Sequence, residues 1–273
     1  MGNFAEKVTG ILFGLAAGDR IGGPVRMAIR VAASLHDKRG FAAEDIGERY
    51  RDWWRAGAFD TGPTVARVLR LVECGASFPE AACRVDHESG GMTAGCNPAH
   101  RSAPLAMCAE IEDSSLARAA LIEAQLTHRH PLAGETAAAV ACLCRSLIRG
   151  VPWSVALGQA AAGRISAIRA ALEPHSVAAV SRSGFAPAAL AAAIHFVDKA
   201  DCFRTALVRS IDFAGPANYC PVLVGSIGGA RWDLDQIEES SFCHHGELVQ
   251  QIRAVAGVLA KSWWNGDANP DDA

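Results

Sequence analysis

The sequence predicts an all-α protein, a compact multi-helix bundle in one domain. Apolar residues recur at intervals of three and four along most of the chain, as on the buried face of a helix. No stretch keeps the alternation of apolar and polar residues that is typical of a β-strand. Half of the 273 residues are hydrophobic, which is enough to bury a large core. A helical solenoid would repeat every 30 to 45 residues or so, and we find no such period.

Composition narrows the classes of function. The net charge of −3 gives no reason to expect nucleic-acid binding. No apolar run approaches the roughly 18 residues of a membrane span, and the first residues lack the features of a signal peptide. The nine cysteines form no Cys-x-x-Cys pair, and their number is odd. We therefore expect a reduced, cytoplasmic protein without contact to a membrane.

The N-terminal third predicts four helices. Val8, Ile11, Leu12 and Leu15 form one apolar stripe, and Gly18-Asp19 closes that helix. A turn at residues 22–24 precedes a second helix over about 25–35 and a third over about 43–55. A fourth helix follows the turn at Gly62-Pro63.

The rest of the chain predicts helices separated by two loops. Residues 86–98 contain three glycines and a proline, and a loop of this length often carries function. A second loop is expected over 173–184. The predicted helices cover residues 99–111, 116–126, 132–149, 154–172, 187–196, 203–213 and 247–262. The domain then spans residues 1–264, and 265–273 form a disordered acidic tail.

Residues 210–230 predict a turn at Ala214-Gly215 and then a helix, with Pro216 in its first turn. Gly225, Gly228 and Gly229 interrupt its apolar pattern. Because each glycine costs a helix about 1 kcal/mol relative to alanine, three of them indicate that a neighbouring helix or a ligand approaches this backbone closely.

Four short motifs precede this stretch, and each also has a purely structural interpretation. Residues 18–24 read Gly-Asp-Arg-Ile-Gly-Gly-Pro, 59–64 read Phe-Asp-Thr-Gly-Pro-Thr, 95–105 read Gly-Cys-Asn-Pro-Ala-His-Arg-Ser-Ala-Pro-Leu, and 127–131 read Thr-His-Arg-His-Pro. The first can be a helix end and turn, and Asp60 or Thr61 can cap the next helix. His100 can be an ordinary histidine, and Thr127-His128 can simply separate two helices.

In this order, from about Gly10 to Trp232, the motifs resemble the ADP-ribosylglycohydrolase family, the dinitrogenase-reductase-activating glycohydrolases and their relatives. The resemblance implies an all-α fold and an ADP-ribose-like ligand or an ADP-ribosylated substrate. It implies that the loop around Gly95 wraps the ligand, with backbone N–H groups at a helix start binding its diphosphate, and that His128 lies by a ribose. The substrate-binding residues it implies are Asp19, Gly95, Cys96, Asn97, His100, Arg101, Thr127, His128 and Tyr219, of which Cys96, Asn97 and His100 depart from the family pattern.

The metal-binding motifs of the family are only partly present in this sequence, because most of their aspartates are replaced. Its members hold two magnesium or manganese ions with aspartates of Thr-Asp-Asp-Thr and Asp-x-Asp-Thr. Asp60 stands in the first of these motifs, and two alignments are possible. In one, Asp60 matches the first aspartate of the motif and Thr61 replaces the second. In the other, Asp60-Thr61 matches the final Asp-Thr of the motif. Residues 216–219, Pro-Ala-Asn-Tyr, stand in the place of the second motif. We expect one Mg²⁺ or none, held by Asp60, Thr61 and Asn218, and not the metal pair.

Arg26 replaces the acidic residue that closes the family's first motif, which reverses a charge beside the expected cleft. We predict that Arg26, Tyr219 or both point into that cleft. Residues 243–245 read Cys-His-His, and these residue types can bind zinc. Adjacent histidines seldom share one ion, however, and no second ligand pair has suitable spacing, so we do not expect a zinc site there.

Three functions remain open. The first is a hydrolase that cleaves a glycosidic bond of an ADP-ribosyl or related nucleotide substrate without the metal pair, with Asp60 or Asp212 as its catalytic carboxylate. The second is a regulator that binds ADP-ribose or a nucleotide without turnover. The third is a scaffold with a vestigial cleft.

Overall fold

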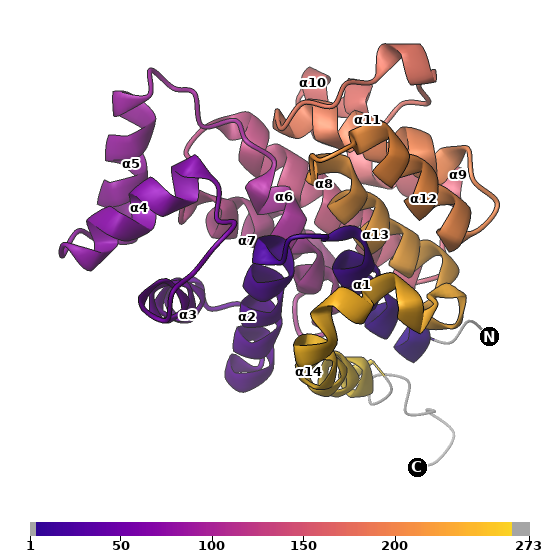
Figure 1. Cartoon of the computed structure of the whole chain (residues 1–273), viewed down its shortest axis with the longest axis horizontal. Coiled ribbons are helices and arrows are strands. Elements are labelled where there is room, and N and C mark those ends of the chain that lie inside the picture. The colour runs from indigo at the N-terminus through magenta and orange to yellow at the C-terminus, as the bar shows by residue number, and fades with distance from the viewer. Residues whose placement is uncertain (1–3, 264–273) are drawn as a thin grey trace.

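The computed structural model describes residues 4–263, and this part of the chain folds into fourteen α-helices with no strand (Figure 1). The all-α prediction is confirmed. The helices are α1 (Phe4–Gly18), α2 (Gly23–Lys38), α3 (Ala43–Arg55), α4 (Pro63–Glu73), α5 (Phe78–Glu88), α6 (Asn97–Ser102), α7 (Asp113–Gln125), α8 (Pro131–Ile148), α9 (Trp153–Ala161), α10 (Ser166–Ala171), α11 (Ala186–Asp198), α12 (Phe203–Ala214), α13 (Tyr219–Trp232) and α14 (Val249–Ser262). Short 3₁₀ segments add η1 (Ala103–Met107), η2 (Val177–Ala179), η3 (Leu234–Gln236) and η4 (Glu239–Leu248).

Helices α1 and α13 lie side by side at the centre of the bundle with their backbones in contact (Figure 1). A methyl group added to Gly14 would overlap the carbonyl oxygen of Gly225, and one added to Gly225 would overlap that of Gly14. Gly10 and Gly229 face each other in the same way. The neighbour predicted for the glycines of residues 225–229 is therefore a helix.

Helix α8 is the second central element. By length and composition it could cross a membrane, but 78% of its apolar window is buried inside the protein. It packs against α6, α7, α9 and α13. Its apolar character is therefore accounted for by its place in the core.

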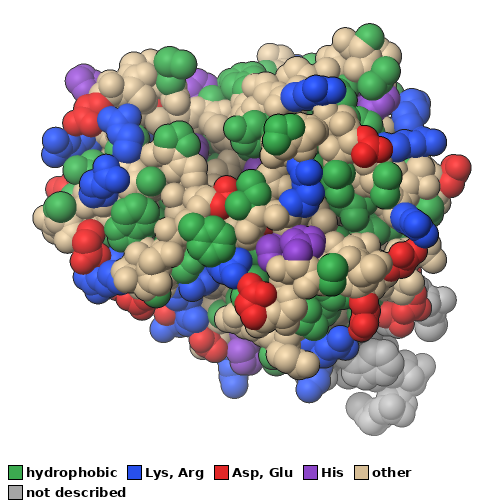
Figure 2. Space-filling view, viewed as in Figure 1, with side chains coloured by type: hydrophobic (Ala, Val, Ile, Leu, Met, Phe, Trp, Pro, Cys, Tyr) green, Lys and Arg blue, Asp and Glu red, His purple; other side chains and the backbone are tan. Residues whose placement is uncertain are grey.

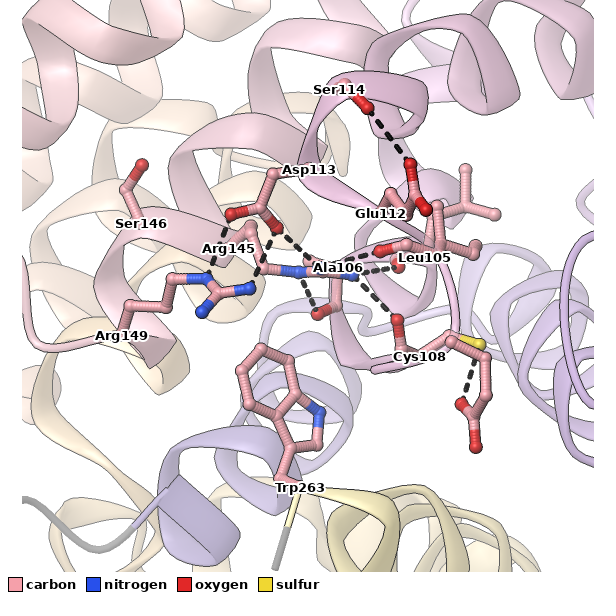
Figure 3. A network of polar contacts seen from close by, with 12 residues as sticks. Leu105, Ala106, Cys108, Glu112, Asp113, Ser114, Arg145, Ser146, Arg149 and Trp263 are labelled. Atoms are coloured by element: carbon pink, nitrogen blue, oxygen red, sulfur yellow. Dashed lines mark hydrogen bonds and ion pairs between the residues drawn. The ribbon is translucent and has the colours of Figure 1, made fainter. Parts of the chain in front are cut away.

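Arg145 of α8 holds the irregular segment that follows α6 (Figure 3). Its guanidinium donates to the carbonyl oxygens of Leu105, Ala106, Cys108 and Ile111 at 2.7–3.3 Å and to Asp113 Oδ1 at 2.7 Å. These carbonyls are thereby satisfied without a continuing helix. The predicted helix over 99–111 is therefore wrong: α6 ends at Ser102 and passes into η1.

Other helices also differ from the sequence prediction. Gly163, at φ +72°, lies in the break that splits the predicted helix 154–172 into α9 and α10. Helix α13 begins at Tyr219, so Pro216 lies in the preceding turn. Helix α5 was not predicted, although Ser77 and Glu80 form a capping box at its start. The predicted tail, 265–273, lies outside the described residues.

Candidate functional site

A cavity of about 390 Å³ opens where the predicted motifs meet. Its size falls within the range of small-molecule sites, roughly 300–1,000 Å³. The lining residues come from the start of α2, the loop into α4, the loop before α6, α6 itself and the loops before α8, α11 and α13. They are Pro24, Asp60, Thr61, Gly62, Pro63, Thr64, Val65, Met92, Gly95, Cys96, Asn97, His100, His128, Gly184, Asn218 and Tyr219.

Asp60 carries the one carboxylate among these lining residues. Its backbone has φ +51°, a left-handed conformation that costs a non-glycine residue free energy. The conformation lets Oδ2 accept the N–H of Gly23 at the start of α2, at 3.2 Å. Partial burial, together with the negative charge of Asp19, raises the pKa of the Asp60 carboxyl above its usual value.

Asp19 lies behind the cavity wall and is completely buried. Its carboxylate accepts the backbone N–H groups of Ile21, Gly22 and Val25 at 2.8–3.2 Å and the side-chain amide of Asn218 at 2.6 Å. Four donors occupy both oxygens, so Asp19 fixes the α1–α2 turn and does not lie where a substrate can touch it.

The histidines of the Cys-His-His cluster bind the same turn. The Nε2 atoms of His244 and His245 both contact the carbonyl oxygen of Asp19, the first at 2.9 Å. Cys243 is exposed. Both imidazoles therefore have a partner in the protein that explains their position.

Two backbone hydrogen bonds tie the Gly95 loop to the segment before α11. Cys96 N–H donates to Gly184 C=O at 2.9 Å, and Ala186 N–H donates to Ala94 C=O at 2.9 Å. The Cys96 N–H is thus not free for a diphosphate. Burial raises the pKa of the Cys96 thiol to about 12, so this side chain presents a neutral wall to the cavity.

Arg101 is completely buried and does not line the cavity. Its Nε donates to Glu123 Oε1 at 2.6 Å, and its terminal nitrogens donate to Asn97 Oδ1 at 2.5 Å and Thr127 Oγ1 at 2.9 Å. Tyr50 donates its hydroxyl to the same oxygen of Glu123 at 2.6 Å. Arg101 and Thr127 therefore support the wall from behind, whereas the resemblance implied that they touch the substrate.

His100 and His128 are the two imidazoles that line the cavity. Burial lowers the pKa of His100 to about 4 and, aided by the charge of Arg101, lowers that of His128 to about 3. Both rings are therefore neutral at physiological pH. The Nε2 of His100 donates to the carbonyl oxygen of Tyr219 at 2.8 Å.

Tyr219 lines the cavity and its ring lies against Gly184, where an added methyl group would come within 2.9 Å of ring carbons. Arg26 does not line the cavity. It pairs with Glu247 at 2.6 Å and lies over the ring of Phe59. Of the two side chains predicted to fill the cleft, the structure places Tyr219 there and Arg26 outside.

The oxygen atoms that line the cavity do not suit the binding of a pair of divalent metal ions. Such ions prefer several carboxylate oxygens, and the cavity offers Asp60 alone. The amide of Asn218 donates to Asp19 Oδ1, and its oxygen accepts the Arg20 N–H at 3.2 Å. Within residues 4–263, the one group of three metal-ligating side chains lies elsewhere, at Glu6, Asp233 and Asp235.

Asp212 lies apart from the cavity on an exposed part of α12, so its predicted catalytic role does not agree with the geometry. Other lining residues were not predicted as site residues. Met92 lies within the loop 86–98 that the sequence marked as functional. Gly184 had no such signal, because only the pairing with Cys96 brings it to the site.

On the face drawn in Figure 2, basic side chains are interspersed with acidic and apolar ones, and histidines gather near its middle. No single sign of charge dominates this face. Long-range electrostatics at this face would not strongly select a highly charged polymer.

Comparisons with known proteins agree with the observed fold. The chain is 23% identical over 211 residues to the ADP-ribosyl-[dinitrogen reductase] glycohydrolase of Rhodospirillum rubrum, covering 77% of this chain and 68% of that protein. It superposes on a solved structure described as an ADP-ribosylglycohydrolase-related protein complex with a TM-score of 0.76 and 23% identity, covering 96% of this chain and 99% of that one. The family model for ADP-ribosylglycohydrolase matches residues 25–268, and the chain belongs to the ADP-ribosylglycohydrolase family.

Proposed function

We propose that this protein hydrolyses a glycosidic bond of an ADP-ribosyl or related nucleotide substrate in the cavity, and that it does so without a dinuclear metal centre. The observation that carries the proposal is the position of Asp60. It is the one carboxylate among the lining residues, and it lies between the start of α2 and the loop into α4.

Asp60 has the chemistry that such a step needs. Hydrolysis at an anomeric carbon passes through an oxocarbenium-like transition state, whose positive charge a nearby carboxylate stabilises. The same carboxylate can take a proton from the water that attacks this carbon, while the glycosidic bond breaks and the leaving group takes up a proton from solvent. The raised pKa of Asp60 makes its ionised form a better proton acceptor than a solvent-exposed aspartate. The Gly23 N–H fixes one of its oxygens and leaves the other available.

The groups that could serve as metal ligands support a reaction without a metal pair. Arg20 donates to the carbonyl oxygens of Gly215 and Ala217, each at 2.6 Å, in the turn where the family places metal ligands. Together with the engaged amide of Asn218, these bonds bind the turn to the protein itself. Of the residues predicted to hold a metal ion, Asp60 and Thr61 remain available as oxygen ligands, which is too few for two ions.

The proposal is tested by turnover of ADP-ribosylated protein and peptide substrates, with released ADP-ribose measured in magnesium and in excess chelator. We expect the same rate in both. Loss of all turnover in chelator, with recovery on adding magnesium or manganese, would show that the protein uses a metal centre after all.

A second candidate is a regulator that binds the same ligand without cleaving it. Glycosidases commonly work with two carboxyl groups, and this cavity presents one, which favours binding alone. Saturable binding of ADP-ribose with no product from any ADP-ribosyl linkage would establish this second function.

A further inference from the structure

A chain of hydrogen bonds runs from a buried ion pair to the cavity wall. Glu123 Oε1 accepts Arg101 Nε at 2.6 Å, Arg101 donates to Thr127 Oγ1 at 2.9 Å, and Thr127 Oγ1 lies 2.8 Å from His128 Nδ1. Glu123, Arg101 and Thr127 are completely buried, and His128 is 3% exposed.

The protons along this chain follow from the chemistry of its members. A guanidinium only donates, so the Thr127 oxygen accepts from Arg101 and its own hydrogen needs another acceptor. Within the described part of the chain, the remaining hydrogen-bond partner of this hydroxyl is His128 Nδ1. A proton on Nδ1 would leave the buried hydroxyl hydrogen unsatisfied, at a cost of about 1–3 kcal/mol. Nδ1 is therefore the acceptor, and Nε2 carries the proton.

The Nε2 atom lies on the cavity side of the ring. His128 lines the cavity, and a methyl group added to Gly95 would be 3.4 Å from Nε2. Among residues 4–263, no protein group accepts a hydrogen bond from this nitrogen. His100 differs, because its Nε2–H is already bound to the Tyr219 carbonyl.

We propose that Glu123, Arg101 and Thr127 are positioning residues that hold His128 in the neutral Nε2–H tautomer, so that it donates a hydrogen bond to an acceptor oxygen of the ligand. A ligand group with only donors, such as an ammonium or a guanidinium, does not complement this position. A sugar hydroxyl, a ring oxygen or a phosphate oxygen does. The burial that keeps the imidazole pKa low acts in the same direction.

The identity of the ligand rests on the proposed function, whereas the tautomer does not, and the test separates the two. Protein labelled with ¹⁵N-histidine is studied by NMR, because protonated and unprotonated imidazole nitrogens have well-separated shifts. The His128 signals are assigned by their loss in His128→Gln. We expect an unprotonated Nδ1 and a protonated Nε2 from pH 5 to 8 in the wild type.

Thr127→Val removes the hydroxyl with little change in shape, and we expect the His128 signals to move toward mixed tautomers. Thr127→Ser keeps the hydroxyl and should restore the wild-type signals. Thr136→Val is the matched control, because Thr136 is also buried and its hydroxyl donates only to Leu132 C=O, at 2.7 Å. It should leave His128 unchanged, and the signals of His100 should not move in any of these variants.

Titration with ADP-ribose gives the second readout, and we expect Thr127→Val to bind about 3- to 10-fold more weakly than Thr136→Val. A wild-type His128 that carries its proton on Nδ1 or on both nitrogens overturns the inference, and so does an unchanged tautomer in Thr127→Val. A protein with the expected tautomer that fails to bind ADP-ribose supports the positioning chain and contradicts the proposed function.

Discussion

At the scale of single residues, the cavity is defined by how its polar side chains are satisfied. Asp19 and Arg101 stand in segments that resemble family motifs, yet their hydrogen bonds are directed into the protein. Asp60 and His128 each keep an atom free toward the cavity. Matching a motif therefore identifies the segment that builds the site, and the hydrogen-bond partners identify which residue within it can act.

Asp60→Asn tests the catalytic assignment. The amide keeps the shape and can still accept the Gly23 N–H, but it neither accepts a proton nor carries charge. We expect turnover to fall at least about 100-fold, with ADP-ribose affinity changed by less than about 3-fold. Steady-state rates and calorimetric titration measure the two quantities. Asp212→Asn is the matched control and should retain full turnover, whereas equal losses in both variants would contradict the assignment.

At the scale of elements, the contact between α1 and α13 sets how the two halves of the site meet. Helix α1 leads into the Asp19 turn, and α13 begins at Tyr219, so a change in their separation would move both walls. This contact depends on paired glycines, because any side chain at Gly14 or Gly225 overlaps the opposite backbone.

Gly225→Ala should lower the free energy of unfolding by at least about 2 kcal/mol, because neither backbone can move without disrupting its helix. Gly158→Ala in α9 is the control, since an added methyl group meets nothing within 4 Å there. The control should be neutral or stabilising by up to about 1 kcal/mol. Urea denaturation measures both, and a Gly225→Ala variant as stable as Gly158→Ala would contradict the proposed close contact.

The sequence predicted some elements from local patterns, although it missed the local capping box of α5, and it could not predict features whose cause is distant along the chain. The periodicity of α3 was sufficient to predict its bounds at residues 43–55. The end of α6 depends on Arg145, more than forty residues later, whose guanidinium binds the carbonyls of the next segment. In the same way, Gly184 lines the cavity because an isolated β-bridge between Gly95 and Phe185 brings the two loops together. No local sequence pattern predicts this bridge.

At the scale of the whole molecule, buried neutral histidines couple folding to pH. In the unfolded chain a histidine takes up a proton below about pH 6.5, whereas folded His100 does so near pH 4 and folded His128 near pH 3. The unfolded state therefore binds more protons in this window, and stability is fully present above pH 6.5 and decreases as the pH falls. The lowered pKa of His245 acts in the same direction.

We expect the free energy of unfolding to fall by about 2–4 kcal/mol between pH 7.5 and pH 5. His128→Gln cannot take up this proton, so its stability should fall distinctly less over the same range. Urea unfolding at a series of pH values measures the slope. Equal slopes in the variant and the wild type would mean that His128 is not kept neutral by the fold.

We propose that the cavity bounded by Asp60, the Gly95 loop and His128 binds an ADP-ribosyl ligand without metal. Calorimetric titration of the protein with ADP-ribose, once in magnesium and once in excess chelator, tests this binding. Gly95→Leu, whose side chain would extend toward His128 Nε2, is the variant expected to block the cavity. We expect the same affinity in both buffers and at least about 10-fold weaker binding in Gly95→Leu. Binding that needs magnesium, or no binding in either buffer, would contradict it.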